Sequence, residues 1–165
     1  MFVLLRHAQA LEKRSWTRPD AERPLSARGE EQALKLVDSL SVLLLVRIIT
    51  SPTRRCHQTV DPLAGHLGIA VEEDVVLGPD TDVHRLTGFL DDPGCEAALL
   101  CTHGETLTAL FAQWQSDEQV RLPVPVQRGG KNATEKSGAW VVDERNGRLD
   151  VRYLPPPVLQ PEVMP

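Results

Sequence analysis

The sequence has few cysteines, few aromatic residues and no long apolar run. Three cysteines occur in 165 residues, and none forms a Cys-x-x-Cys pair: Cys56, Cys95 and Cys101. A disulfide framework is therefore not indicated, and we expect buried free thiols. The longest apolar run, residues 42–46, is far shorter than the ~20 residues that span a bilayer. We interpret this run as a buried strand or the end of a helix.

An excess of positive charge is also missing. The chain has 18 Lys and Arg against 23 Asp and Glu, a formal net charge of −5. This balance disfavours general nucleic-acid binding, which usually shows a basic excess. The first residues lack a basic segment followed by a longer apolar stretch and a small-residue cleavage site, so no signal peptide is expected. These absences favour a cytoplasmic protein without a membrane or nucleic-acid-polymer partner.

Apolar runs alternate with helical patterns along the chain, as in proteins built on parallel sheets. The predicted strands cover residues 2–5, 46–50, 69–72, 97–102, 138–143 and 149–153. Helices are predicted after residue 26, after 51–52, over 83–90 and over 107–114. Asn146-Gly147 joins the last two strands and is a strong hairpin signal. The alternation predicts a three-layer α/β/α sandwich with a mainly parallel central sheet.

One domain, residues 1–154, is expected from the length, followed by a proline-rich tail, residues 155–165. In the first helix, Ala33, Val37, Leu40 and Leu44 recur at helical spacing and predict one apolar face. Residues 8–24 are polar and irregular and predict a long loop. Long loops in compact domains are often functional.

Polar clusters follow three of the predicted strands. Arg6-His7 follows the first strand, Arg54-Arg55 lies just beyond the second, and His103 follows the strand over 97–102. Ligands of open α/β sheets bind beyond the carboxyl ends of the strands. We therefore expect a single pocket to collect these side chains.

Arginine and histidine in one pocket suit phosphoryl transfer. The planar guanidinium of arginine can donate hydrogen bonds to two phosphate oxygens at once, and it stays charged. A neutral imidazole can attack phosphorus and form a phosphohistidine that water later hydrolyses. Enough fixed cations can replace a metal ion in this chemistry.

Four segments, taken in order, resemble signatures of the histidine phosphatase superfamily, the group that includes cofactor-dependent phosphoglycerate mutases. They are Leu-Leu-Arg-His-Ala-Gln-Ala at 4–10, the Pro-Leu-Ser segment within 23–33, Ser-Pro-Thr-Arg-Arg-Cys-His-Gln-Thr at 51–59 and Cys-Thr-His-Gly-Glu at 101–105. The family usually has glycine at the position of Ala8. With alanine there, the motif is similar to that of the short bacterial phosphohistidine-phosphatase-like branch. Residues 136–157 are similar to the phosphatase domain of Nudix–phosphatase fusions. The resemblance implies a phosphoglycerate mutase-like fold.

The resemblance also implies roles for individual residues. His7 would be the phosphorylated nucleophile, Arg6 and Arg55 would bind phosphate, and His103 would be the second histidine of the pocket. Arg55 rather than Arg54 falls on the family's second arginine. Four further residues are expected to contact substrate: Gln9, Arg23, Glu105 and Lys136. No metal ligand and no cofactor are implied.

The function expected from these residues is metal-independent hydrolysis of a phosphomonoester or a phosphohistidine-type phosphoramidate through phospho-His7. The substrate would be a phosphorylated small molecule or a phosphohistidine protein. Four alternatives stay open: a nucleotide- or pyrophosphate-directed phosphatase, a mutase, a noncatalytic module that binds a phosphorylated ligand, and a zinc site of Cys56, Cys101, His7 and His103.

The proton donor for the leaving group has no clear motif. Asp80, Asp82 and Glu105 are the candidates that the sequence offers. A leaving group of low basicity, such as imidazole or pyrophosphate, needs less help from an acid, so the reaction could also proceed without one of them.

Overall fold

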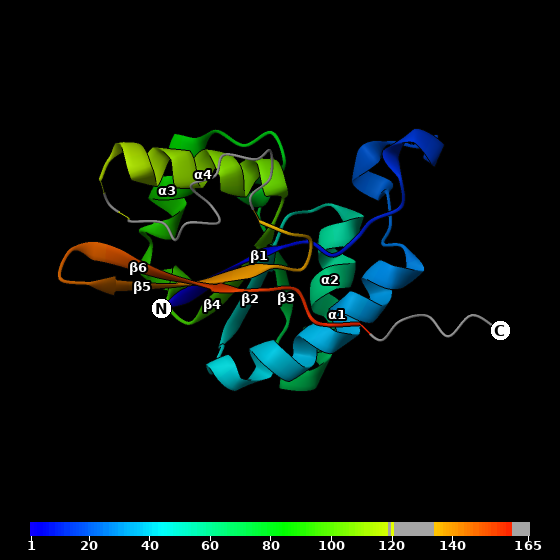
Figure 1. The fold of residues 1–165 in the computed structure, drawn as a ribbon, viewed down its shortest axis with the longest axis horizontal. Helices are drawn as coiled ribbons and strands as arrows, with labels where there is room; N and C mark the ends of the chain where they lie inside the picture. The colour runs from blue at the N-terminus through cyan, green and yellow to red at the C-terminus, as the bar shows by residue number, and fades with distance from the viewer. Residues whose placement is uncertain (119, 121–133, 160–165) are drawn as a thin grey trace.

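A six-stranded mixed sheet organises the computed structural model, which describes residues 1–118, 120 and 134–159 (Figure 1). Its strand order is β3-β2-β4-β1-β5-β6. Four strands are parallel: β1 (Phe2–Arg6), β2 (Arg47–Thr50), β3 (Val71–Glu73) and β4 (Ala98–Thr102). The antiparallel hairpin of β5 (Ala139–Arg145) and β6 (Arg148–Leu154) completes the sheet beside β1.

Helices cover both faces of the sheet, and Figure 1 shows the two pairs on opposite sides. The helices are α1 (Ala27–Leu40), α2 (Arg54–Leu67), α3 (Val83–Leu90) and α4 (Gly104–Ser116). Successive side chains of a strand point to opposite faces. Accordingly, Val3 and Leu5 of β1 join the core beneath α1 and α2, while Leu4 joins the core beneath α3 and α4. The three-layer α/β/α prediction is confirmed.

The starts and ends of the elements follow local chemistry. Ser26 caps α1 by accepting a hydrogen bond from the Gly29 N–H at 3.2 Å. Gly68 ends α2 in the left-handed region, with φ of 67°. Asn146 and Gly147 both have positive φ, as the predicted hairpin turn requires.

Two local predictions are wrong. Leu44 is 84% exposed and lies beyond α1, because the helix ends at Leu40 and a 3-10 turn (Ser41–Leu43) follows. Leu36, which the predicted apolar face did not include, packs in the core beside Leu40 instead of Leu44. The apolar run at 42–46 is therefore largely a solvent-facing connection rather than a buried element.

The proline-rich tail is described only over residues 155–159, which form neither helix nor strand. The rest of the predicted tail, residues 160–165, lies outside the described residues. In the part of the chain that the structure describes, no helix has both the length and the apolar character to cross a membrane.

Candidate active site

His7 lies immediately after β1, where the carboxyl ends of the parallel strands meet. Its backbone N–H donates to the Thr102 carbonyl of β4 at 3.0 Å, which joins the ends of two neighbouring strands. Its Nδ1 lies 2.7 Å from the Ala8 carbonyl oxygen. A carbonyl can only accept, so Nδ1 carries the hydrogen and the lone pair of the neutral ring is on Nε2. This tautomer leaves Nε2 available as a nucleophile.

The surroundings of His7 keep its ring neutral. The side chain is only 7% exposed. Burial lowers the pKa of His7 to about 4, and the nearby charge of Arg55 acts in the same direction. The hydrogen bond to Ala8 opposes this shift without cancelling it. The nucleophilic form of the ring therefore predominates at neutral pH.

Arg6 brings a half-buried cation to the same strand end. Its Nη1 donates to the Thr134 carbonyl at 2.6 Å. Burial lowers the pKa of Arg6, and the charge of Glu105 opposes that shift. Gly104 permits this arrangement, because a Cβ at that position would lie 2.6 Å from Arg6 Cζ. The first residue of α4 thus has to be glycine for the Arg6 guanidinium to pack against it.

Arg55 lies in the first turn of α2 and is 2% exposed, whereas Arg54 is exposed. Arg55 Nη2 lies 3.3 Å from His103 Nδ1. Because arginine only donates, His103 Nδ1 accepts this hydrogen bond and its proton lies on Nε2. The Nε2–H lies 2.9 Å from Ser51 Oγ. His103 therefore positions Arg55 with one nitrogen and contacts Ser51 with the other, and its ring centroid lies 5.2 Å from that of His7.

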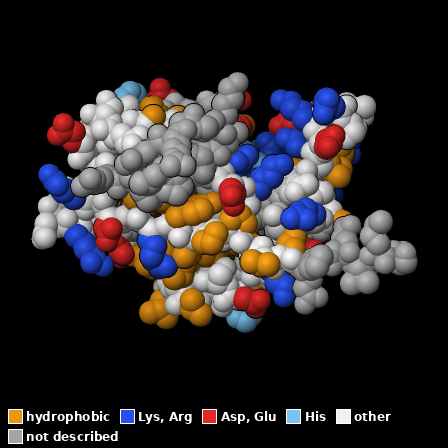
Figure 2. Space-filling model, in the orientation of Figure 1, with side chains coloured by type: hydrophobic (Ala, Val, Ile, Leu, Met, Phe, Trp, Pro, Cys, Tyr) orange, Lys and Arg blue, Asp and Glu red, His pale blue; other side chains and the backbone are white. Residues whose placement is uncertain are grey.

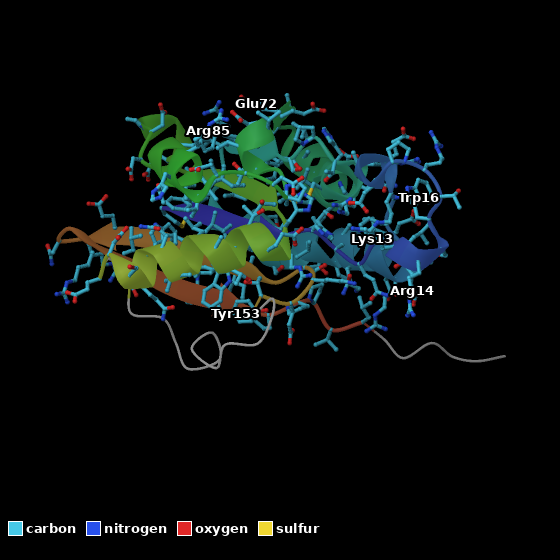
Figure 3. The ribbon with its side chains drawn as sticks, turned by 90° about the horizontal axis from the view of Figure 1, so that it is seen from above. Lys13, Arg14, Trp16, Glu72, Arg85 and Tyr153 are labelled. Carbon is cyan, nitrogen blue, oxygen red and sulfur yellow. The ribbon has the colours of Figure 1, made fainter. Side chains whose placement is uncertain are left out.

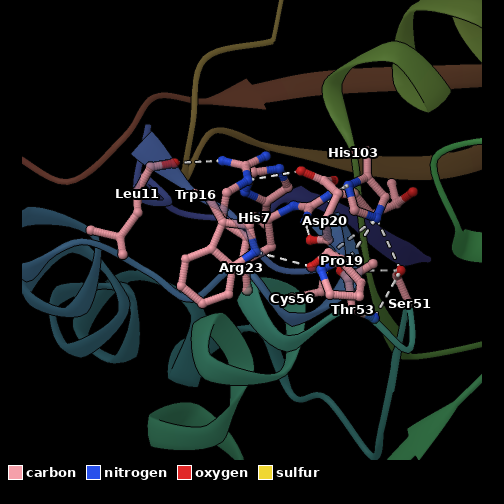
Figure 4. A network of polar contacts seen from close by, with 12 residues as sticks. His7, Leu11, Trp16, Pro19, Asp20, Arg23, Ser51, Thr53, Cys56 and His103 are labelled. Atoms are coloured by element: carbon pink, nitrogen blue, oxygen red, sulfur yellow. Dashed lines mark hydrogen bonds and ion pairs between the residues drawn. The ribbon is translucent and has the colours of Figure 1, made fainter. Parts of the chain in front are cut away.

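Asp20, in the loop over residues 8–24, contacts both Arg23 and Arg55 (Figure 4). The sequence did not single out this residue. Its carboxylate accepts from Arg23 Nε at 2.9 Å and pairs with Arg55 Nη2 at 3.1 Å. Its backbone carbonyl accepts from Arg55 Nη1 at 2.8 Å. Burial alone would raise the pKa of Asp20, but the hydrogen bond from Arg23 and the charges of both arginines lower it. A single carboxylate of the protein thus pairs with two cations, Arg23 and Arg55, that were expected to contact the substrate.

The other predicted substrate-contacting residues lie around this centre. Lys136 is largely exposed, but partial burial of its amino group lowers its pKa, and the charges of Arg6 and Arg23 act in the same direction. These three cations therefore lie in one region. Figure 2 shows Lys and Arg side chains gathered around a hollow beside the loop that carries Asp20. Glu105 lies in the first turn of α4, near Arg6. Gln9 is held through its backbone, which contacts Gln32 and Ser26.

Two buried guanidinium nitrogens lack a hydrogen-bond partner among the described residues. They are Arg6 Nε and Arg55 Nε. Buried donors are normally satisfied, and those that are not often mark a place where a ligand binds. The unsatisfied donors are cationic, so the fitting ligand is an anion.

The cysteines do not form a metal site in the part of the chain that the structure describes. Cys56 Sγ lies 3.6 Å from His103 Nε2, but no group of three or more His, Cys, Asp or Glu side chains is arranged around a common point there. All three cysteines are buried free thiols, as expected. The zinc alternative therefore gains no support from the arrangement of these donors.

Comparison with known proteins agrees with the resemblance found in the sequence. Residues 2–78 match the family model of the histidine phosphatase superfamily (branch 1). The chain is 28% identical over 163 residues to the 8-oxo-(d)GTP phosphatase of Mycolicibacterium smegmatis. That match covers 94% of this chain and 48% of the relative, so the chain spans about half the length of that protein.

Solved structures share the fold. The putative phosphohistidine phosphatase SixA from Agrobacterium tumefaciens superposes with a TM-score of 0.71 at 20% identity, over 93% of this chain and 96% of that one. A tungstate complex of the protein histidine phosphatase SixA gives a TM-score of 0.72 at 20% identity, with the same coverage of both chains. The predicted resemblance and the predicted fold are both confirmed.

The protonation of His7 can be measured directly. We expect NMR titration of the His7 ring to give a pKa near 4, with the hydrogen of the neutral form on Nδ1. The unfolded chain takes up this proton near pH 6.5. The free energy of unfolding should therefore fall as the pH drops from about 6.5 towards 4, because only the unfolded state gains the proton there. Titration of His7 near 6.5 would contradict the assigned environment.

Replacing Asp20 tests whether its carboxylate competes with a bound oxyanion. In Asp20→Asn the charge that pairs with Arg55 and Arg23 is gone, so inorganic phosphate should bind more tightly, by several-fold in calorimetric titration. Glu22→Gln is the matched control, because Glu22 lies in the same 3-10 turn and pairs with Arg18 instead. Weaker phosphate binding by Asp20→Asn would mean that Asp20 chiefly orients Arg55.

Proposed function

We propose that this chain, which carries the sequence and the fold of the histidine phosphatase superfamily, is a phosphatase that uses His7 as its nucleophile. The observation that carries the proposal is the hydrogen bond between His7 Nδ1 and the Ala8 carbonyl. It fixes the tautomer whose Nε2 lone pair is free, in a ring that burial keeps neutral. A binding module would need cations for a phosphate group, but it would not need a neutral nucleophile of defined tautomer.

In the first half of the proposed reaction, His7 Nε2 attacks the phosphorus of the substrate. A bond forms between that nitrogen and phosphorus, and the bond from phosphorus to the leaving group breaks, with its electron pair going to the leaving group. Arg6 and Arg55, each with a buried unsatisfied Nε, would stabilise the negative charge on the phosphoryl oxygens. Arg23 and Lys136 would add positive charge at the edge of the site.

His103 has a positioning role in this proposal. Because both of its ring nitrogens already contact protein groups, it holds the Arg55 guanidinium through Nδ1 and reaches the Ser51 hydroxyl through Nε2. Asp20 would move off Arg55 and Arg23 when the substrate phosphoryl group takes over its contacts. In the second half of the reaction, water attacks phosphorus, inorganic phosphate leaves and His7 regains its neutral form.

Of the three candidates for a proton donor, Asp82 is the least suited. Asp82 caps α3 by accepting hydrogen bonds from the Arg85 and His84 N–H groups, and these bonds lower its pKa. A carboxyl group held in this ionised form is a poor acid, so Asp80 and Glu105 remain as candidates. Because no acid is held in place by a recognisable motif, we expect leaving groups of low basicity, such as a phosphoramidate nitrogen or a phosphate anhydride oxygen, to be preferred over alkoxides.

Substitution of the two central residues tests the proposal, with folded protein verified by circular dichroism. We expect His7→Ala to lose at least a thousandfold in kcat on a panel of phosphohistidine peptide, nucleotide, sugar phosphate and aryl phosphate, because no nucleophile remains. We expect Arg55→Lys to lose about tenfold or more, because lysine cannot reproduce the fork that contacts both Asp20 and His103.

Matched controls come from the same helix. His66→Ala and Arg54→Lys alter exposed residues of α2 and should change kcat less than twofold. All assays include a chelator. Turnover by folded His7→Ala at the unaltered rate would overturn the nucleophile assignment, and a larger loss in Arg54→Lys than in Arg55→Lys would overturn the assignment of the second arginine.

A further inference from the structure

A buried serine hydroxyl beside His7 takes no part in the reaction described above. Ser137 is 1% exposed, and its Oγ has no hydrogen-bond partner among the described residues. Arg6 Nε and Arg55 Nε share this property. Buried donors are normally satisfied, and an exception in a native fold calls for an explanation such as a ligand. The Ser137 hydroxyl is therefore a third buried donor that a bound anion could satisfy.

Other buried hydroxyls at the strand ends have a contact within the protein. Thr102 Oγ1 donates to the Leu77 carbonyl at 2.6 Å. Thr50 Oγ1 lacks a hydrogen-bond partner by distance and angle, but Thr50 is the register partner of Cys101 on β4 and its hydroxyl acts on the Cys101 thiol. Ser137 has no such neighbour among the described residues, which sets it apart from the structural hydroxyls.

Ser137 lies directly beside the backbone of the proposed nucleophile. The pairing of β1 with β5 ends at Leu5 and Ala139. Just beyond that pair, the Ser137 N–H lies 3.2 Å from the Arg6 carbonyl oxygen and 3.3 Å from the His7 carbonyl oxygen. The serine thus lies at the carboxyl end of β1, where the parallel strands end and where the proposed site lies.

Contacts with both strands of the hairpin fix the segment over residues 134–138. The Thr134 hydroxyl accepts a hydrogen bond from Trp140 Nε1 of β5 at 3.0 Å. The Glu135 N–H donates at 3.3 Å to the hydroxyl of Tyr153, which is labelled on β6 in Figure 3. The backbone that carries the serine is therefore held in place, as a group that contacts a substrate needs to be.

The backbone at Ser137 is also strained. Its φ is 65°, in the left-handed region that favours glycine. A serine at this position costs free energy in its backbone and again in its unsatisfied hydroxyl. Strained residues of this kind cluster at functional sites, and a contact between the hydroxyl and a ligand would offset the second cost.

We propose that Ser137 Oγ donates a hydrogen bond to an oxygen of the phosphoryl group held at His7, beside Arg6 and Arg55. The inference rests on the proposed function and deepens it. The hydroxyl keeps its proton, and no bond to Ser137 forms or breaks when phosphorus passes from the leaving group to His7 and then to water. As a neutral donor, it holds a phosphoryl oxygen without adding positive charge to a site that already gathers several cations.

Substitution by glycine separates the hydroxyl from the strain, because Ser137→Gly removes the oxygen and suits a φ of 65°. We expect calorimetry to show about tenfold weaker binding of inorganic phosphate, and kcat/KM for the best substrate of the panel to fall about tenfold. The melting temperature should stay within about 3 °C of the wild-type value. Ser137→Ala, which lacks only the oxygen, should show the same two losses.

Asn146→Gly is the matched control. Asn146 is another exception to the preference for glycine, with φ of 54°, and it is exposed in the turn between β5 and β6. Its substitution by glycine should leave phosphate binding and kcat/KM unchanged.

The outcomes separate this inference from the proposed function. Unaltered phosphate binding and kcat/KM in both Ser137 variants would overturn the contact and leave the nucleophile intact. A loss confined to Ser137→Gly would also overturn it, because backbone freedom would then be the cause. If the wild-type protein turns over no substrate, the proposed function fails and calorimetry decides the contact. Phosphate that binds the wild type and binds both variants more weakly supports it, while equal binding, or no binding to the wild type, overturns it.

Discussion

The proposed chemistry of this site depends on the hydrogen bond from His7 Nδ1 to the Ala8 carbonyl. It selects the tautomer of a ring that burial keeps neutral, and so leaves the other nitrogen free to attack. The Ala8 N–H donates to Thr59 Oγ1, and the Thr59 hydroxyl donates to the Arg55 carbonyl. The turn of α2 that carries the second arginine therefore also supports the backbone that orients the nucleophile.

Sheet topology and charge balance explain the rest of the site. The parallel pairing of β1, β2 and β4 brings three strand ends together. It thereby gathers cations that cost free energy to bury unless they are paired. Asp20 offsets part of that cost through its contacts with Arg55 and Arg23. A substrate phosphoryl group would offer the same kind of charge to the same donors, so in the proposed function binding exchanges one anion for another.

Much of the fold could be predicted from the sequence because burial and turn chemistry leave periodic or local signals. The strand before His7, the Ser26 cap and the Asn-Gly turn are examples. Leu44 was assigned to the core because periodicity does not show where a helix ends. Arg55 could be separated from Arg54 only through the family motif. Asp20 lies in a loop without periodicity, and its role depends on contacts across 35 residues, which no local pattern encodes.

The central claim is that phosphate passes through His7, and trapping the intermediate tests it most directly. The wild-type protein would be mixed with a turned-over substrate, quenched in alkali, in which phosphohistidine survives, and digested for mass spectrometry of the peptide that contains residue 7. The account predicts one phosphate on that peptide, bonded to Nε2 of His7 and absent when the substrate is omitted. Rapid turnover with no phosphate on His7, or with phosphate on another residue, would contradict it.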